Sequence, residues 1–261
     1  MLAGRSGIRN LPDDITEGTG IAVGGQVPSL EEDAIAGYDP ERIISAKDRK
    51  KMDRFIEFAL VAAHEALEQA GWHPTEVTDQ ARTATIIASG VGGFGAIADA
   101  VRTTDARGPR RLSPFTAPSF LANMAAGHVS IRHGFKGPLG APVTACAAGV
   151  QAIGDAARII RAGEADIAIC GGTEAAIDRV TLGCFAAARA PSTGFAEQPQ
   201  AASRPFDRDR DGFFVRKLDR AGLARASPTR DAKCSREGGS FSRYMTCPRA
   251  RGNQQLLVSY R

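Results

Sequence analysis

The sequence lacks the features that would place it in a membrane or outside the cell. No apolar run reaches the ~18 residues that a membrane-spanning helix needs. The first residues do not combine a charged start with an apolar stretch, as a secretory signal does. The five cysteines are irregularly spaced, which matches neither a disulfide framework nor a zinc site. We therefore expect a cytoplasmic protein with no metal and no membrane partner.

A phosphate-binding glycine loop is also missing, as is any internal repeat. The segment Ser89–Gly93 follows an apolar run and precedes a short helical pattern, as a dinucleotide-binding turn does. Its glycines do not have the G-x-G-x-x-G spacing, and no acidic residue ends a second strand about twenty residues later. We therefore expect no bound cofactor.

The hydrophobic pattern that is present predicts an α/β domain. Apolar extended runs alternate with helical patterns, which is typical of a parallel or mixed sheet covered by helices. Ser45 and Asp48 have the spacing of a capping box at the start of the first long helix. Residues 9–45 carry no regular pattern. The predicted strands are 83–88, 139–143 and 166–170, and the predicted helices are 45–70, 94–103, 118–133 and 146–163.

Cys146 lies where an extended run turns into a helix. A helix N-terminus presents unpaired N–H groups and the positive end of the helix dipole, which favour a thiolate. The same N–H groups can hold the oxyanion that forms when a thiolate attacks a carbonyl. The junction alone is equally consistent with a small buried cysteine that packs the turn. Cys170 and Cys184 are expected to be buried packing residues.

Ordered motifs surround this cysteine along most of the chain. They include Ser113-Pro114-Phe115, Asn123–His128, Lys136-Gly137-Pro138, Gly171–Glu174, Phe185–Ala190, Ala201–Asp207 and Arg210–Phe213. From about residue 2 to about residue 214, the chain resembles the β-ketoacyl-[acyl-carrier-protein] synthases, specifically the type II condensing enzyme of bacterial fatty-acid synthesis. The resemblance implies the N-terminal half of a thiolase-type fold, with a mixed sheet and helices on both faces.

The resemblance also implies an acyltransferase chemistry. Cys146 would accept an acyl group from an acyl-carrier protein, and the carbanion from decarboxylated malonyl-carrier protein would then attack the acyl-cysteine. Leu112 and Phe185 match residues of the acyl pocket, with ordinary core packing as the alternative. Lys47, Lys51 and Arg189 match basic positions that face the acidic carrier protein, with a plain solvated face as the alternative. The resemblance further implies a homodimer and no nucleic-acid partner.

Two catalytic histidines of that family have no counterpart in the sequence. The family places them downstream of the cysteine, whereas His64, His73, His128 and His133 all precede Cys146. The family's first strand is also missing before Leu2. We therefore expect a fragment, truncated at both ends and inactive alone. A polyketide or nodulation-type ketosynthase, and a non-catalytic remnant that only binds a carrier protein or subunit, remain alternatives.

The resemblance breaks inside a motif, after Phe213. Residues 216–261 hold eleven Lys and Arg residues against three Asp and Glu, in a chain with a net charge of +4. We expect a domain over 1–215, without the strand that should follow Phe214 and hence with unpaired sheet edges. We interpret 216–261 as an out-of-frame or wrongly joined reading. A disordered tail and a basic tail that binds nucleic acid are the alternatives.

Overall fold

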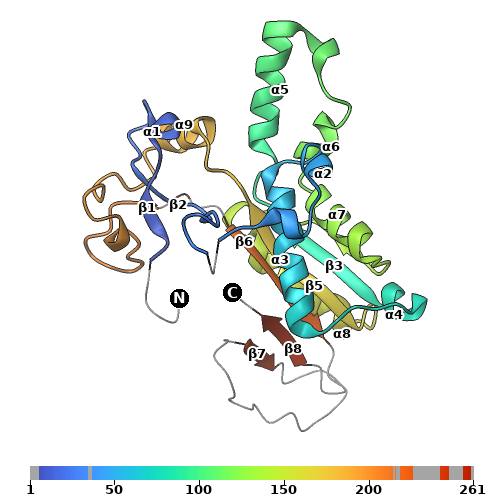
Figure 1. Cartoon of the computed structure of the whole chain (residues 1–261). Helices are drawn as coiled ribbons and strands as arrows, with labels where there is room; N and C mark the ends of the chain where they lie inside the picture. Colours follow the sequence, from blue (N-terminus) through green and yellow to red (C-terminus); the bar gives the residue numbers. More distant parts are fainter. Residues whose placement is uncertain are drawn as a thin grey trace. The chain divides into compact units, whose positions relative to one another are not determined.

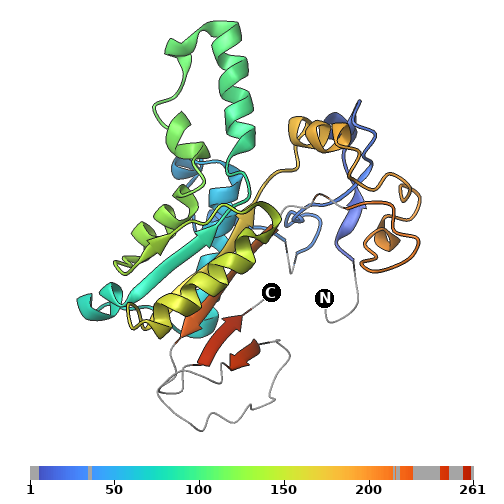
Figure 2. The same ribbon diagram turned by 180° about the vertical axis from the view of Figure 1, so that it is seen from behind.

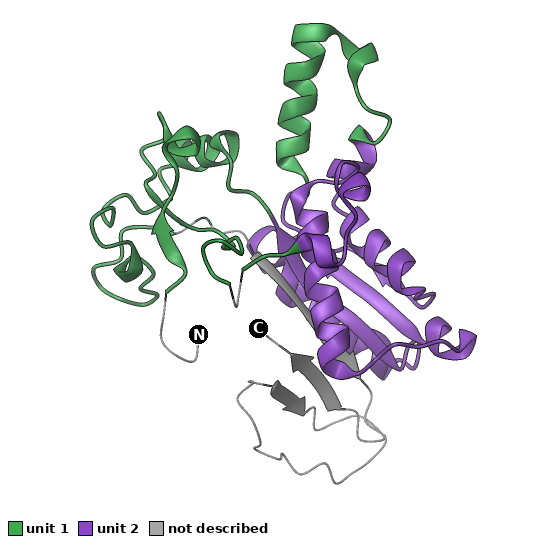
Figure 3. Ribbon diagram, viewed as in Figure 1, with its two compact units in different colours: residues 1–39, 93–116, 175–218 green, residues 40–92, 117–174, 219–261 purple. Residues whose placement is uncertain are grey.

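The structure is a computed structural model, and it describes residues 6–34, 37–213, 215, 218–225, 242–246 and 255–259. The chain divides into two compact units, which Figure 3 shows in separate colours. Unit 1 consists of residues 1–39, 93–116 and 175–218, and unit 2 consists of residues 40–92, 117–174 and 219–261. Each unit is therefore assembled from three separate stretches of sequence.

The sheet of unit 2 has four strands in the order β4-β3-β5-β6. The strands are β3 (Thr83–Ala88), β4 (Leu139–Gly140), β5 (Ile167–Glu174) and β6 (Leu218–Arg225). β3 runs parallel to β4 and to β5, with Ala88 opposite Gly172. Since parallel neighbours end at the same edge of a sheet, the segments that follow β3, β4 and β5 meet at one edge.

Helices cover both faces of this sheet, as the sequence predicted (Figures 1 and 2). α8 (Ala148–Arg161) packs on β3 and β5 from one side, and α3 (Arg54–Ala70) and α7 (Met124–His133) lie on the other. Small side chains let α8 and the sheet approach closely. Their shared core consists of Ala84, Ile86, Ala88, Ala148, Ala152, Ala156, Ala157, Ile160, Ala165, Ala168 and Cys170.

Two of the predicted helices are interrupted. The first becomes α2 (Ala46–Arg49) and α3, because the Asp53 side chain accepts a hydrogen bond from Phe55 N and starts a new helix there. The predicted helix 118–133 becomes α6 (Thr116–Phe120) and α7. Ser45 is confirmed as the N-cap, since its hydroxyl accepts from Asp48 N at 3.1 Å, and it also donates to Asp48 Oδ2 at 2.8 Å.

The other predicted elements differ mainly in length. The run 139–143 pairs only at Leu139–Gly140, whereas β5 continues beyond residue 170 to Glu174. α5 (Phe94–Arg107) is longer than predicted, and α4 (Val77–Ala81) was not predicted. The helix expected from Cys146 begins at Ala148, after a 3-10 turn.

Besides α5, unit 1 contains regular structure that the sequence did not predict. β1 (Ile8–Asn10) pairs antiparallel with β2 (Val23–Gly25), and α1 (Asp13–Thr16) lies between them in sequence. α9 (Arg179–Ala187) is capped by Asp178, whose side chain accepts hydrogen bonds from Val180 N and Thr181 N. A small core joins the first and last stretches of this unit and consists of Leu11, Ile21, Ile177, Leu182 and Val215. Across the described ranges, no helix has the length and apolar character needed to cross a membrane.

Strands also lie within residues 216–261. β6 is placed next to β5, so the expectation that no strand follows Phe214 is wrong. β7 (Ser242–Thr246) and β8 (Gln255–Ser259) pair antiparallel, with Tyr244 opposite Leu257. The predicted domain end at residue 215 stays a prediction, and the rest of 216–261 lies outside the described residues.

Aromatic rings gather at the end of α7. The ring of His133 stacks on that of Phe135 with centroids 5.6 Å apart, and on that of His64 at 6.4 Å. Among the described residues, the buried Nε2 of His133 meets no hydrogen-bond partner. Burial above all, followed by the nearby His64 and Arg132, lowers the pKa of His133 to about 4. The imidazole is therefore neutral in the folded chain near neutral pH.

We expect acid to destabilise the fold through His133. In the unfolded chain its pKa is near 6.5, so the unfolded chain takes up the proton first and the free energy of unfolding falls as the pH drops from 6.5 towards 4. The variant H133F keeps an aromatic ring and removes that proton uptake. Its melting temperature should fall less than that of the wild type between about pH 7 and about pH 5. Scanning calorimetry of H133F and the wild type at both pH values tests this. Equal falls for H133F and the wild type would contradict it.

Candidate active site

Cys146 lies in a strained turn immediately before α8. The 3-10 turn Ala145–Ala147 is closed by a hydrogen bond of 3.1 Å from Ala147 N to Thr144 O. Ala145 has a φ of +48°, a left-handed conformation that costs about 1–3 kcal/mol for a residue with a side chain. The Cys146 thiol is exposed, so the alternative of a buried packing cysteine is wrong. An exposed thiol on a constrained backbone is the arrangement that a nucleophile needs.

Glycines bring this turn close to the edge of the sheet. A Cβ on Gly172 of β5 would lie 2.9 Å from Gly149 Cα in α8. A Cβ on Gly90, just after β3, would lie 3.5 Å from the Ala145 carbonyl oxygen. The start of α8 and the turn before it therefore pack directly against the backbone at the carboxyl ends of β3 and β5.

Glu174 is a residue that the sequence reasoning did not single out. Its Oε2 accepts hydrogen bonds from Gly90 N at 2.8 Å, from Val91 N at 3.0 Å and from the Ser89 hydroxyl at 3.4 Å. The hydroxyl of buried Ser89 also accepts from Gly92 N at 2.9 Å. The segment Ser89–Gly92 is thus organised by an acidic side chain of the same unit. The sequence did offer a signal for Glu174, because it is an acidic residue at the end of an apolar strand.

The other described cysteines have different surroundings. Cys170 is buried among small side chains, as predicted, and burial raises the pKa of its thiol to about 12. Cys184 was expected to be buried but is exposed. On α9 the core side is defined by Leu182 and Ala186, four residues apart, so a residue midway between them faces away from that core. Cys146 and Cys184 are therefore both accessible thiols.

The two predicted acyl-pocket residues belong to unit 1, whereas Cys146 belongs to unit 2. Leu112 is half-buried and directly follows the 3-10 turn Pro109–Arg111. Phe185 lies on α9 and makes an edge-to-face contact with Phe213, with ring centroids 5.2 Å apart. Their roles in a pocket stay predictions.

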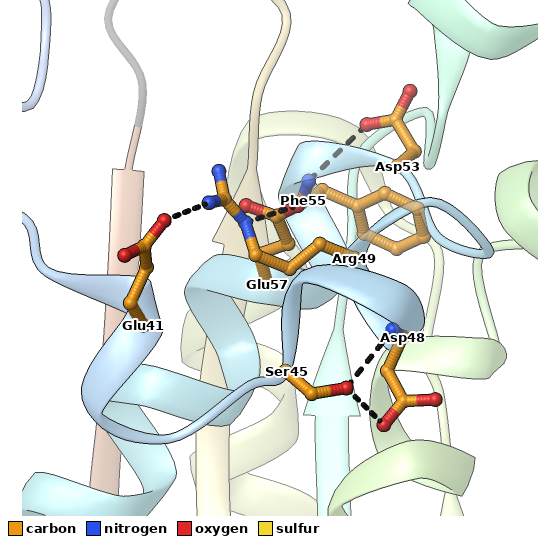
Figure 4. A network of polar contacts seen from close by, with 7 residues as sticks. All are labelled: Glu41, Ser45, Asp48, Arg49, Asp53, Phe55 and Glu57. Atoms are coloured by element: carbon orange, nitrogen blue, oxygen red, sulfur yellow. Dashed lines mark hydrogen bonds and ion pairs between the residues drawn. The ribbon is translucent and has the colours of Figure 1, made fainter.

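Lys47 lies within the short helix α2 and Lys51 just after it, and a polar network fixes this helix (Figure 4). Arg49 pairs with Glu57 of α3 at 3.3 Å and with Glu41 at 3.5 Å. Glu57 is only 7% exposed, so its pairing with Arg49 anchors α2 to the longer helix. Lys47 is presented to solvent on this anchored helix.

Lys51 and Arg189 have more constrained positions than Lys47. Lys51 Nζ pairs with Asp48 Oδ1 at 2.7 Å, and this hydrogen bond, followed by that from Ser45, holds the pKa of Asp48 below its ordinary value. Arg189 is exposed in unit 1 and has a φ of +53°. Three further arginines of unit 1, which the sequence reasoning did not select, are exposed just before Leu112, namely Arg107, Arg110 and Arg111.

Comparison with known proteins assigns the family. A family model described as "Beta-ketoacyl synthase, N-terminal domain" matches residues 1–215. The chain belongs to the beta-ketoacyl synthase family. This confirms the resemblance found in the sequence, including the thiolase-type α/β fold.

The synthases that this chain resembles are considerably longer than the chain itself. The 3-oxoacyl-[acyl-carrier-protein] synthase 2 of Rhizobium meliloti (strain 1021) is 48% identical over 178 residues, which are 68% of this chain and 42% of the relative. A crystal structure of a beta-ketoacyl synthase from Burkholderia phymatum STM815 superposes with a TM-score of 0.71 at 25% identity, covering 85% of this chain and 51% of that one. The chain thus spans about half the length of these synthases.

A third similar protein has been solved with a partner. Its structure is described as a type II PKS acyl-carrier protein in complex with its ketosynthase bound to the hexaketide. The match has a TM-score of 0.55 at 26% identity and covers 60% of this chain and 45% of that one. A 3-oxoacyl-[acyl-carrier-protein] synthase and a type II PKS ketosynthase therefore both occur among the similar proteins.

Proposed function

We propose that the chain is the N-terminal part of a 3-oxoacyl-[acyl-carrier-protein] synthase of fatty-acid biosynthesis, with Cys146 as its acyl acceptor. The observation that carries the proposal is the exposed thiol directly after strained Ala145, on a turn pressed against the carboxyl edge of β3 and β5. Ligand and reaction sites of open parallel sheets form at this edge. The 48% identity to a 3-oxoacyl-[acyl-carrier-protein] synthase supports the choice of substrate class.

The first half-reaction is a thioester exchange. The Cys146 thiolate attacks the carbonyl carbon of an acyl thioester, and the carbon–sulfur bond to the carrier breaks. The carrier leaves as a thiolate, which then takes up a proton. Backbone N–H groups at the start of α8 can hold the oxyanion of the tetrahedral intermediate. In the complete reaction, malonyl-carrier protein loses carbon dioxide and its carbanion displaces Cys146 from the acyl group. The product is a β-ketoacyl thioester two carbons longer.

The proposed partner is an acidic acyl-carrier protein. The exposed Lys47, on a helix that Arg49 anchors, suits electrostatic attraction of such a protein, as do the exposed Arg110 and Arg189. The related ketosynthase solved with its acyl-carrier protein supports the same class of partner. We also propose Leu112 and Phe185 as contacts of the acyl chain.

A homodimer in the cytoplasm completes the proposal. β4 lies at one edge of the four-stranded sheet, and apolar side chains on and near it are exposed in unit 2. They are Ile131, Leu139, Val143 and Val150. Such exposed apolar side chains suit contact with a second copy of the chain. We propose the cytoplasm as its location because we assign the chain to fatty-acid biosynthesis.

Two alternative functions are consistent with the same observations. A polyketide or nodulation-type ketosynthase uses the same acyl-cysteine chemistry, and the solved polyketide relative favours keeping it. A non-catalytic remnant that only binds a carrier protein or subunit would keep the surface of α2 but would not need a reactive Cys146.

Acyl transfer to Cys146 tests the proposal. The purified chain is incubated with an acyl-carrier protein that bears a labelled fatty acyl group, and its peptides are mapped by mass spectrometry. We expect the acyl mass on the Cys146 peptide and none on the Cys184 peptide, although both thiols are exposed. C146A should lose the modification and C184A should keep it. Binding of the carrier without acyl transfer would instead support the non-catalytic remnant.

A further inference from the structure

Glu174 connects three segments at the carboxyl edge of the sheet in unit 2. It is the last residue of β5, and along a strand alternate residues face the same side. Cys170, Gly172 and Glu174 therefore share the side on which α8 packs, in agreement with the contact between Gly172 and Gly149. From this side the carboxylate reaches the turn after β3, where it accepts from Gly90 N and Val91 N.

The same turn lies beside the residue that precedes Cys146. A Cβ added to Gly90 would lie 3.5 Å from the Ala145 carbonyl oxygen, an ordinary van der Waals distance, and 2.8 Å from Glu174 Oε2. Ser89 N also donates to Pro142 O at 3.4 Å, which fixes the turn to the segment after β4. Glu174 therefore holds, through Gly90, backbone that lies beside Ala145 in the nucleophile's own turn.

We propose that Glu174 is a positioning residue for Cys146. Its carboxylate holds Gly90 and Val91 by charge-assisted hydrogen bonds, which are roughly twice as strong as neutral ones. The held turn supports Ala145 in its left-handed conformation and so fixes the direction of the Cys146 N–H and thiol. The inference rests on the proposed function, because it assigns Glu174 to the acyl transfer that Cys146 performs.

Two reactions of Cys146 separate positioning from simple thiol reactivity. Acyl transfer from a fatty-acyl thioester of N-acetylcysteamine passes through an oxyanion that needs well-placed N–H donors. Alkylation by iodoacetamide passes through no oxyanion and needs only an accessible thiolate. In E174A we expect the acyl-transfer rate at Cys146 to fall by about 10- to 100-fold, as small misplacements of reacting groups do. Its alkylation rate should change by less than about threefold.

Three matched comparisons accompany E174A. E174Q keeps an acceptor oxygen at the same reach without the charge, and it should recover part of the lost acyl transfer. E164A removes an exposed carboxylate before the opposite end of β5 and should behave like the wild type. Buried Cys170 reports the fold within each sample, because it becomes alkylated only if unit 2 opens.

The possible results distinguish failure of the proposed function from failure of the positioning role of Glu174. A wild-type chain that takes up no acyl group at Cys146 removes the proposed function itself. If the wild type is acylated and E174A matches it within about twofold, the positioning role is overturned. It is also overturned if both the acyl-transfer rate and the alkylation rate of Cys146 fall while Cys170 becomes alkylated. That result would mean that E174A has lost the fold. Faster reactions in both E174A and E174Q would show that the carboxylate only repels the thiolate, and would overturn it as well.

Discussion

The 261-residue chain should form β-ketoacyl product at least about 1000-fold more slowly than an intact synthase, even when Cys146 takes up an acyl group. Decarboxylative condensation creates a carbanion and an enolate oxygen, which in the family two histidines stabilise. None of the four histidines follows Cys146 in the sequence. His64 of α3 stacks on His133 of α7, and the ring of His133 stacks on that of Phe135. Catalytic groups that act as a unit lose most of their effect together.

The condensation assay supplies acyl- and malonyl-carrier protein and measures the β-ketoacyl product by mass spectrometry. The synthase of Rhizobium meliloti serves as the positive control. Acyl uptake by Cys146 in the same sample shows that the site is assembled, so acyl uptake without product distinguishes loss of the condensation step from an unfolded chain. A rate within about tenfold of the relative would contradict the prediction.

Replacement of Gly172 by alanine should destabilise unit 2 and disrupt the site, whereas replacement of Gly154 should stabilise it. A Cβ at Gly172 meets Gly149 Cα at 2.9 Å, and neither backbone can move away easily. We expect a loss of about 1–3 kcal/mol in the free energy of unfolding, as overpacked cores show. Gly154 lies within α8, and a Cβ there meets only Arg158 Nη1 at 3.8 Å. Alanine should add up to about 1 kcal/mol there, because glycine is a poor helix former.

Urea unfolding of G172A, G154A and the wild type measures both effects. The two variants make the same chemical change, one between β5 and α8 and the other on α8 where the added Cβ meets no strand atom, so each is the control of the other. G172A should also lose acyl transfer at Cys146, because a displaced α8 moves the turn that carries the thiol. Equal stability of G172A and the wild type would mean that α8 and β5 do not approach as described.

The local elements were predictable from the sequence where side-chain pattern alone decides them. The apolar run 83–88 became β3 with both ends as predicted, and Ser45 and Asp48 formed the predicted cap. The ordered motifs identified the family, and the strand-to-helix junction at Cys146 pointed to a nucleophile. These features depend on residues close in sequence or on a long motif order, and both can be read without knowing the fold.

Elements decided by distant contacts were predicted less well. The helix expected over 45–70 breaks at Asp53, where capping of α3 competes with continuation of α2. Cys184 was expected to be buried because it neighbours Phe185, but the side of α9 that packs is the one defined by Leu182. β6 was missed because its composition is basic and carries no strand period, while its place beside β5 is a property of the sheet.

The sequence by itself therefore determined the family, the fold class and the cysteine at the centre of the proposed chemistry. The tertiary structure decided which groups surround that cysteine. Glu174 and Gly90 are 84 residues apart, and only the parallel pairing of β3 and β5 brings the carboxylate to that backbone N–H. The strain at Ala145 and the contact of Gly172 with Gly149 likewise exist only once α8 packs on the sheet. Side-chain pattern specifies local structure and buried faces, whereas a site assembled at a sheet edge depends on the register of strands that the sequence keeps far apart.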